Sequence, residues 1–171
     1  HAGHYLFPDE MLLRLIGRIG FPVWFFLVGY AKSRSVDKAF WIWAILLQVS
    51  HFPFGNHALP LNALFTMIAI RLCIDPLMHR VLCSPLIFWG ASVVFLVLGI
   101  PTSSIVEYGT LGLLFAMFGW LVRHRDDLEE PDAVLPQFFA FCVGGFVLTE
   151  YIVFGFAQWK FLVLFAGTFA V

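Results

Sequence analysis

Residues 81–100 read VLCSPLIFWGASVVFLVLGI and contain no charged side chain. A helix needs about 20 consecutive apolar residues to cross the hydrocarbon core of a bilayer. This stretch therefore predicts a transmembrane helix. The sequence on both sides repeats this pattern, with apolar runs separated by short polar segments that contain Pro and Gly. The repeated pattern indicates the fold class of the whole chain.

The composition of the whole chain agrees with a lipid environment. Of the 171 residues, 61% are hydrophobic, 18% are aromatic and only 12% are charged, and the mean hydropathy is +0.89. An ordinary soluble domain is about one quarter charged. The apolar surface exceeds what one soluble core could bury, so lipid is the expected solvent for most of it. The net charge of -1 and the lack of a dense basic patch exclude a nucleic-acid partner.

The apolar runs predict an all-α polytopic transmembrane bundle that forms a single domain over residues 1–171. We expect about seven helices in this chain, near Met11–Ala31, Ala39–Phe52, Leu61–Ile74, Val81–Ile100, Ile105–Val122, Val134–Phe156 and from Phe161 to the end. The chain has no initiator Met and opens on His1 directly before a polar turn. We therefore expect it to begin inside a longer protein, with one further helix upstream.

The basic residues predict the orientation of the bundle. Alternate loops contain Lys or Arg, namely Lys32, Arg34 and Lys38, then Arg71 and Arg80, then Arg123 and Arg125. The loops around 51–60 and 101–107 contain none. Because positive residues are retained in the cytoplasm, we expect the three basic loops there. His1–Glu10, residues 51–60 and Glu107 then face the periplasm or the exterior.

Charged residues inside predicted helices are candidates for function, because they are costly in a membrane. Arg14 and Arg18 are four residues apart and share one helix face. They could hold an anionic substrate or cofactor group, or they could pair with Glu107 or Glu150 for structural reasons. The charged segment 123–132 has two interpretations as well. It is either a solvated loop or a gate that meets an anionic cofactor through Arg123 and Arg125.

Histidine and cysteine give weaker signals. His1, His4, His51 and His57 all fall in the loops assigned to the exterior, where an imidazole could act as a general base. No His or carboxylate spacing typical of a metal site occurs, so we expect no metal. The three cysteines, Cys73, Cys83 and Cys142, lie in or beside apolar runs without a CxxC pair, and we interpret them as buried small hydrophobic residues.

Four short segments together resemble the TraX family of membrane proteins. They are HAGHYLFPD (1–9), LRLIGRIGFP (13–22), LNALFT (61–66) and VEYGTLGLL (106–114). The family pattern has Asp-His-x-Gly, then Arg-x-Ile-Gly-Arg-x-x-Phe-Pro, then Asn-x-x-Phe-Thr, and then Asp-Tyr-Gly-x-x-Gly. Here Glu107 replaces the Asp of the last element. His1 corresponds to the His of the first element, which would place its Asp in the upstream segment.

The TraX family is associated with N-terminal acetylation of conjugative pilin. The resemblance therefore implies a bacterial inner-membrane enzyme that uses acetyl-CoA from the cytoplasm as its donor. It implies His1 as the general base or as a transiently acetylated nucleophile. Arg18, Asn62 and Tyr108 would orient this base or hold the acyl oxygen. The nucleotide end of acetyl-CoA would meet Lys32, Arg34, Arg71, Arg123 or Arg125, and Arg14 with Arg18 would line an inner channel.

The acceptor and the class of protein stay open at this point. The acetyl group could go to a protein N-terminus such as a pilin, or to a hydroxyl on a cell-surface sugar. Alternatively, the chain is a non-catalytic membrane subunit, and its buried charges hold helices or partner chains together. A transporter is a third alternative, because Pro22, Pro53, Pro60 and Pro101 could break helices, but the two halves contain no matching pair of interrupted helices.

Overall fold

The structure is a computed structural model, and it describes residues 11–50 and 59–154. Side chains are described in these ranges except at 11–19, 150, 153 and 154. The described residues form six α-helices and one short 3-10 helix. These are α2 (Met11–Tyr30), α3 (Lys38–Ser50), α4 (Ala63–Val81), α5 (Pro85–Thr102), α6 (Gly109–Arg123), η2 (Arg125–Asp127) and α7 (Pro131–Phe154). The prediction of an all-α fold is confirmed for the described part of the chain.

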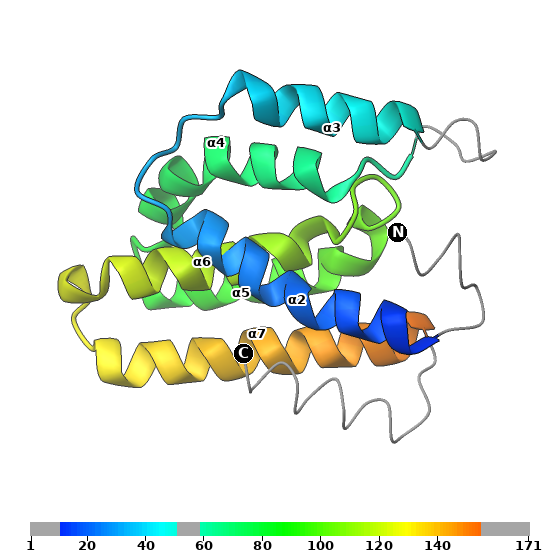
Figure 1. Cartoon of the computed structure of the whole chain (residues 1–171). Coiled ribbons are helices and arrows are strands. Elements are labelled where there is room, and N and C mark those ends of the chain that lie inside the picture. The colour runs from blue at the N-terminus through cyan, green and yellow to red at the C-terminus, as the bar shows by residue number, and fades with distance from the viewer. Residues whose placement is uncertain (1–10, 51–58, 155–171) are drawn as a thin grey trace.

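Helix α6 is the centre of the bundle, and it packs against α2, α4, α5 and α7 (Figure 1). Most of its side chains are buried, and Leu114, Phe115, Met117 and Leu121 are at most 2% exposed. Phe25 of α2 and Phe146 of α7 belong to the same hydrophobic core. A helix that is apolar on all sides in this way is expected in the middle of a bundle.

Two glycines bring α2 and α6 into close contact. A Cβ atom added at Gly29 would clash with the backbone of Ala116, and one added at Gly119 would clash with the backbone of Phe26. Small residues at such positions allow two helix backbones to approach each other, which is a common way to pack helices in membranes. The position of α2 against α6 therefore depends on the absence of these two side chains.

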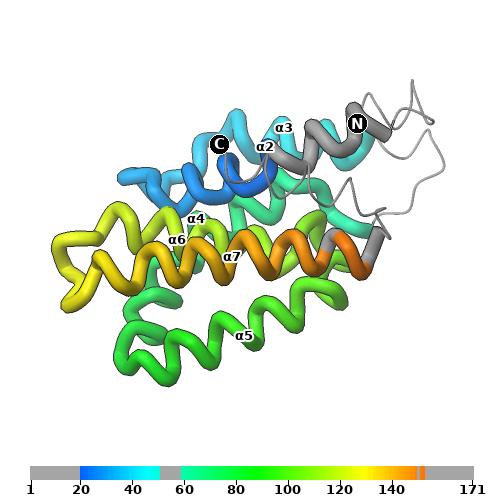
Figure 2. The backbone as a smooth tube through the Cα atoms, turned by 90° about the horizontal axis from the view of Figure 1, so that it is seen from below, coloured from blue at the N-terminus to red at the C-terminus, as the bar shows by residue number. Residues whose placement is uncertain are grey.

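The outer surface of the bundle is apolar. On α5, which lies at an edge of the bundle in Figure 2, Leu86 is 82% exposed and Val97 is 66% exposed. On α3 only Ala44 is buried. Two stretches, Pro85–Thr102 and Pro131–Thr149, are long and apolar enough to cross a membrane, and shorter apolar helices occur at Gly20–Tyr30, Lys38–Ser50 and Gly109–Arg123.

The boundaries of the described helices agree with the sequence prediction to within about four residues, except at the end of α4. The predicted span Leu61–Ile74 is too short, because α4 continues to Val81. Its last two turns contain Asp75, His79 and Arg80, whose polarity had suggested a loop. These residues lie at the end of the bundle and are partly or largely exposed, so helix and polarity are compatible there. The predicted helix from Phe161 onward lies outside the described residues.

The helices run alternately in opposite directions, so the connections gather at two ends (Figures 1 and 2). We call one the basic end, and it contains segments 31–37, 82–84 and 124–130. We call the other the Glu107 end, and it contains segments 59–62 and 103–108. Every Lys and Arg whose side chain is described lies in or beside the segments of the basic end, apart from Arg71, which contacts Ser35 there. The expected grouping of the basic loops at one end is therefore present.

The cysteine interpretation is only partly correct. Cys142 on α7 is buried, whereas Cys73 and Cys83 are exposed and all three are free. Cys73 points away from the core on α4, and Cys83 lies in the turn before α5. An apolar run does not by itself distinguish a core face from an outward face when the outward face is apolar as well.

Candidate functional site

Asn62 organises the start of α4 at the Glu107 end. Its side-chain oxygen accepts hydrogen bonds from the backbone N–H groups of Leu64 (3.1 Å) and Phe65 (3.4 Å). Its amide nitrogen donates to the carbonyl of Ala44 on α3 (2.8 Å). Asn is among the best N-cap residues, and Asn62 is only 3% exposed. The side chain predicted to hold an acyl oxygen therefore caps α4 and joins α4 to α3.

Glu107 connects the α5–α6 segment to the same helix start. Its Oε2 accepts a hydrogen bond from the backbone N–H of Ala63 (3.1 Å), and its backbone carbonyl accepts one from the hydroxyl of Thr66 (2.9 Å). The backbones of Leu61 and Val106 form an isolated parallel bridge beside it. A carboxylate at a helix N-terminus is stabilised by the free N–H groups and the helix dipole.

Tyr108 follows Glu107 in a left-handed conformation, with φ of 67°. Its ring stacks on Phe21 of α2, with 4.0 Å between the ring centroids and 17° between the planes. Gly109, also left-handed, begins α6, and a Cβ atom there would clash with Thr102. A non-glycine residue with positive φ is uncommon and must be held by its surroundings. The stacking on Phe21 provides such support for Tyr108.

Four short segments of the sequence resemble the TraX family, and we call them the family-like segments. Three of these four segments meet at the Glu107 end. They contribute Phe21, then Asn62 with Thr66, and then Glu107 with Tyr108. Arg18 lies three residues before Phe21 on α2, and Arg14 lies one turn further toward the helix start. The side chains of both arginines, and all of His1, lie outside the described residues. Sequence reasoning assigned no role to Phe21, although the Phe-Pro element in the first helix contained it.

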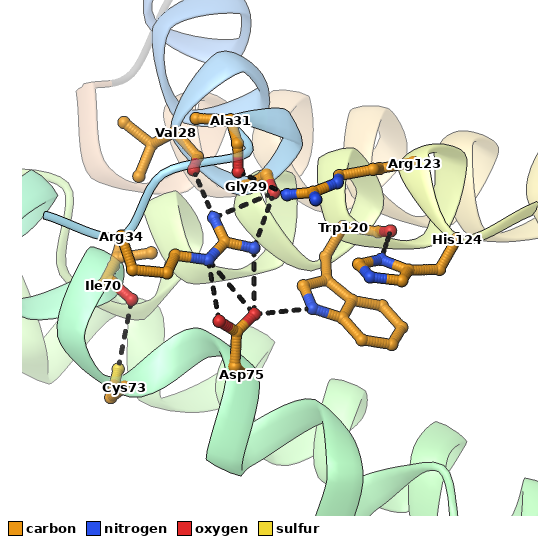
Figure 3. Close-up of polar contacts among 10 residues, drawn as sticks. All are labelled: Val28, Gly29, Ala31, Arg34, Ile70, Cys73, Asp75, Trp120, Arg123 and His124. Carbon is orange, nitrogen blue, oxygen red and sulfur yellow. Dashed lines mark hydrogen bonds and ion pairs between the residues drawn. The ribbon is translucent and has the colours of Figure 1, made fainter.

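Arg34 is the centre of a second polar cluster, at the basic end (Figure 3). Its Nε and Nη2 donate to both carboxylate oxygens of Asp75 on α4, at 2.9 to 3.1 Å. Its Nη1 and Nη2 also donate to the carbonyls of Val28 and Gly29 in the last turn of α2, at 3.0 to 3.2 Å. Those carbonyls have no partner within the helix, so Arg34 satisfies them and ties α2 to α4.

Trp120 completes this cluster from α6 (Figure 3). Its indole N–H donates to Asp75 (2.9 Å), and its ring stacks on His124 with 3.8 Å between centroids. The hydrogen bonds from Arg34 lower the pKa of the Asp75 carboxyl below its ordinary value, burial opposes this, and the Trp120 hydrogen bond adds to the lowering. Asp75 lies beyond the apolar part of α4, at the basic end.

The arginines predicted to bind a cofactor are used differently from one another. Arg123 donates to the carbonyl of Ala31 just after α2 (2.7 Å), and Arg125 forms an exposed ion pair with Asp132 (2.6 Å). Arg71 has a long hydrogen bond to the carbonyl of Ser35 (3.4 Å). These three lie toward the basic end. Arg14 is 16 residues before the last residue of α2, about 24 Å along the helix. The structure therefore separates the predicted cofactor residues into two groups.

The described residues contain no group of three or more His, Cys, Asp or Glu side chains that could hold a metal ion. Three of the histidines considered above, His4, His51 and His57, lie outside the described residues with His1.

The apolar exterior and the helices long enough to cross a bilayer point to a membrane protein of the all-helical class. The family model described as TraX protein matches residues 1–168, and the chain belongs to this family. It is also similar to an uncharacterized protein of Rickettsia prowazekii (strain Madrid E), with 24% identity over 132 residues. That match covers 73% of this chain and 50% of the relative, so the chain spans about half of the relative's length. No solved structure matches the chain.

Proposed function

We propose that the chain is a membrane-embedded acetyltransferase that moves the acetyl group of acetyl-CoA to a protein N-terminus such as that of a pilin. Membership of the TraX family supports the reaction. One structural observation supports a site: Phe21, Asn62, Thr66, Glu107 and Tyr108 come from three distant family-like segments and meet at one end of the bundle.

The proposed chemistry needs few groups, because a thioester is already activated. The acceptor amine attacks the thioester carbonyl carbon, the new C–N bond forms, and the C–S bond breaks to release the thiol of CoA. His1 would take the proton from the amine and return it to the leaving sulfur. Arg18 and the Tyr108 hydroxyl would donate hydrogen bonds to the carbonyl oxygen as it gains negative charge. Asn62 would support them by fixing the start of α4, where its side chain is already engaged.

The two ends of the bundle would have separate tasks. Helix α6 runs from Gly109 to Arg123, about 21 Å, and so spans from the Glu107 end to the basic end. The protein would lie in the inner membrane of a bacterium, with its basic end in the cytoplasm. The phosphates of acetyl-CoA would bind at this basic end. The pantetheine arm would then run along the bundle toward Arg14 and Arg18, and the acceptor would arrive from the periplasm.

The test is acetyl transfer by the full-length protein. Purified protein would be incubated with radiolabelled acetyl-CoA and a panel of acceptors that contains pilin N-terminal peptides and surface sugars. We expect label in a peptide, and loss of at least about a hundredfold in rate for His1→Ala, the usual effect of removing a general base. His4→Ala, three residues along the same segment, is the matched control and should retain the activity.

A second function has support from the basic end. There Arg34, Asp75 and Trp120 hold three helices together, as expected of a non-catalytic membrane subunit. The same assay separates the two proposals. A wild-type protein that neither binds acetyl-CoA nor labels any acceptor would leave the subunit as the better proposal, and label in a sugar would replace the peptide acceptor.

A further inference from the structure

Arg71 on α4 has a guanidinium group with an unused hydrogen-bond donor. Its Nε atom is buried and has no hydrogen-bond partner among the described residues. Its Nη1 makes only the 3.4 Å contact to the carbonyl of Ser35. Arginine is always charged and has five donors, and buried donors of this kind are nearly always paired. An acceptor from outside the described chain is therefore expected near Arg71.

The other arginines at this end differ from Arg71. Arg34 uses all three of its nitrogen atoms on Asp75 and on the end of α2. Arg123 donates to Ala31, and Arg125 pairs with Asp132 at the surface. Asp75 lies one turn after Arg71 on α4, and its oxygens accept hydrogen bonds from Arg34 and Trp120. Arg71 itself forms no ion pair within the described part of the chain.

The segment opposite Arg71 adds groups that suit an anion. Ser33 and Ser35 are exposed and carry hydroxyls that are 2.5 Å apart. Lys32 and Lys38 are exposed at the two ends of the same segment, and neither forms an ion pair within the described part of the chain. Asp37 is the one acidic residue of this segment. Its backbone carbonyl accepts a hydrogen bond from a backbone N–H group in the first turn of α3.

We propose that Arg71 is the centre of a phosphate-binding site, with the hydroxyls of Ser33 and Ser35 and the ammonium groups of Lys32 and Lys38 around it. A guanidinium group matches phosphate oxygens through paired hydrogen bonds. The inference rests on the proposed function in one respect: if the protein is an acetyltransferase, the phosphate belongs to the nucleotide end of acetyl-CoA. A phospholipid headgroup carries the same chemistry and is the other source.

Inorganic pyrophosphate is the probe for the site itself. Its binding to the purified full-length protein in detergent would be measured by calorimetry, for the wild type, Arg71→Gln, Arg71→Lys and Arg80→Gln. Arg80 lies on the same helix near the same end, is exposed, and has no partner within the described part of the chain, so its substitution removes the same charge. Circular dichroism and thermal unfolding would verify that each variant is folded.

We expect Arg71→Gln to bind pyrophosphate at least about tenfold more weakly than the wild type, the effect of one lost charge-assisted hydrogen bond. Arg80→Gln should bind as the wild type does. Arg71→Lys keeps the charge and should weaken binding less, which makes it informative even where Arg71→Gln is unfolded. Equal binding by the wild type and both Arg71 variants, or no binding by the wild type, would overturn the site.

Competition identifies the source of the phosphate. If acetyl-CoA displaces pyrophosphate from the wild type, the site serves the donor. If only an anionic phospholipid in mixed micelles displaces it, the site stands and belongs to the lipid. A wild type that transfers acetyl groups while Arg71→Gln binds pyrophosphate normally would refute the site alone. Intact pyrophosphate binding without any acetyl transfer would refute the proposed function alone.

Discussion

Arg34 and Arg71 show how strongly the role of an arginine depends on its neighbours. Arg34 lies between the carboxylate of Asp75 and the last carbonyls of α2, where a cation is favoured by the helix dipole. Arg71, one turn before Asp75 on α4, has only a carbonyl at 3.4 Å and a buried nitrogen without a partner. The first is a structural contact, whereas the second has capacity for a ligand.

Substitution of Asp75 by Asn tests the structural contact. The folded-state pKa of Asp75 is lowered, so its ionised form stabilises the fold at pH values above its unfolded pKa, and this contribution is lost as pH falls through the lowered value. We expect Asp75→Asn to reduce the stability at pH 7 by about 1 kcal/mol, since the carboxylate is partly exposed and screened.

Thermal unfolding at pH 7 and at about pH 3 would measure this change, and the difference between Asp75→Asn and the wild type should shrink at the lower pH. Asp132→Asn is the control, because its ion pair with Arg125 is fully at the surface and should contribute little. A constant difference at both pH values would contradict the role of the ionised carboxylate.

At the scale of elements, α6 determines how the bundle is assembled. It contacts α2 through Gly29 and Gly119, and its start is fixed by the left-handed Tyr108 and Gly109. The atoms that face these two packing glycines are backbone atoms, which cannot move aside as a flexible side chain can. The separation of α2 and α6, and with it the stacking of Phe21 on Tyr108, therefore has little tolerance for added volume.

Gly119→Ala should accordingly destabilise the protein by about 1–3 kcal/mol, the usual effect of overpacking a close contact. Gly90→Ala on α5 is the matched control, because a Cβ atom there would have no neighbour within 4 Å. It should be neutral or slightly stabilising, since Ala favours a helix more than Gly does. Thermal unfolding of both variants in detergent would decide, and equal stability would mean that α2 and α6 can separate without loss.

The whole molecule has two chemically different ends joined by an apolar body. The basic end contains Lys and Arg together with acidic residues in segments 31–37 and 124–130, whereas the described segments of the Glu107 end contain one carboxylate and no Lys or Arg. Since positive residues are retained in the cytoplasm, we predict that the basic end is cytoplasmic. The large exposed residues on α3 and α5 would then face lipid.

Cysteine labelling in spheroplasts tests this orientation. Cys83 is exposed in the turn between α4 and α5 at the basic end, and Ser104 is exposed at the Glu107 end. One variant would keep Cys83 alone, and the other would carry Ser104→Cys without the native cysteines. A membrane-impermeant maleimide should label Ser104→Cys in intact spheroplasts, and Cys83 only after permeabilisation. The reverse pattern would refute the predicted orientation.

The sequence predicted the helices well, because the length of an apolar run is a local property. The stretch at 81–100 corresponds to α5, which begins at Pro85, and the prediction failed mainly at α4, where polar residues continue the helix. The four short segments likewise indicated the TraX family, and the family match agrees over residues 1–168. The site was only partly predictable: Asn62 and Tyr108 were chosen, but their actual contacts with Ala44 and Phe21 were not.

The sequence by itself therefore determined an all-helical, lipid-compatible chain of the TraX family, since apolar run length, punctuation and motif order are written along the chain. Only the tertiary structure decided which charges are engaged. Glu107 reaches the backbone of Ala63 across 44 residues, and Arg34 reaches Asp75 across 41. Hydrogen bonds act over about 3 Å in space regardless of separation in sequence, so these partners become defined only once α6 has brought the helices together.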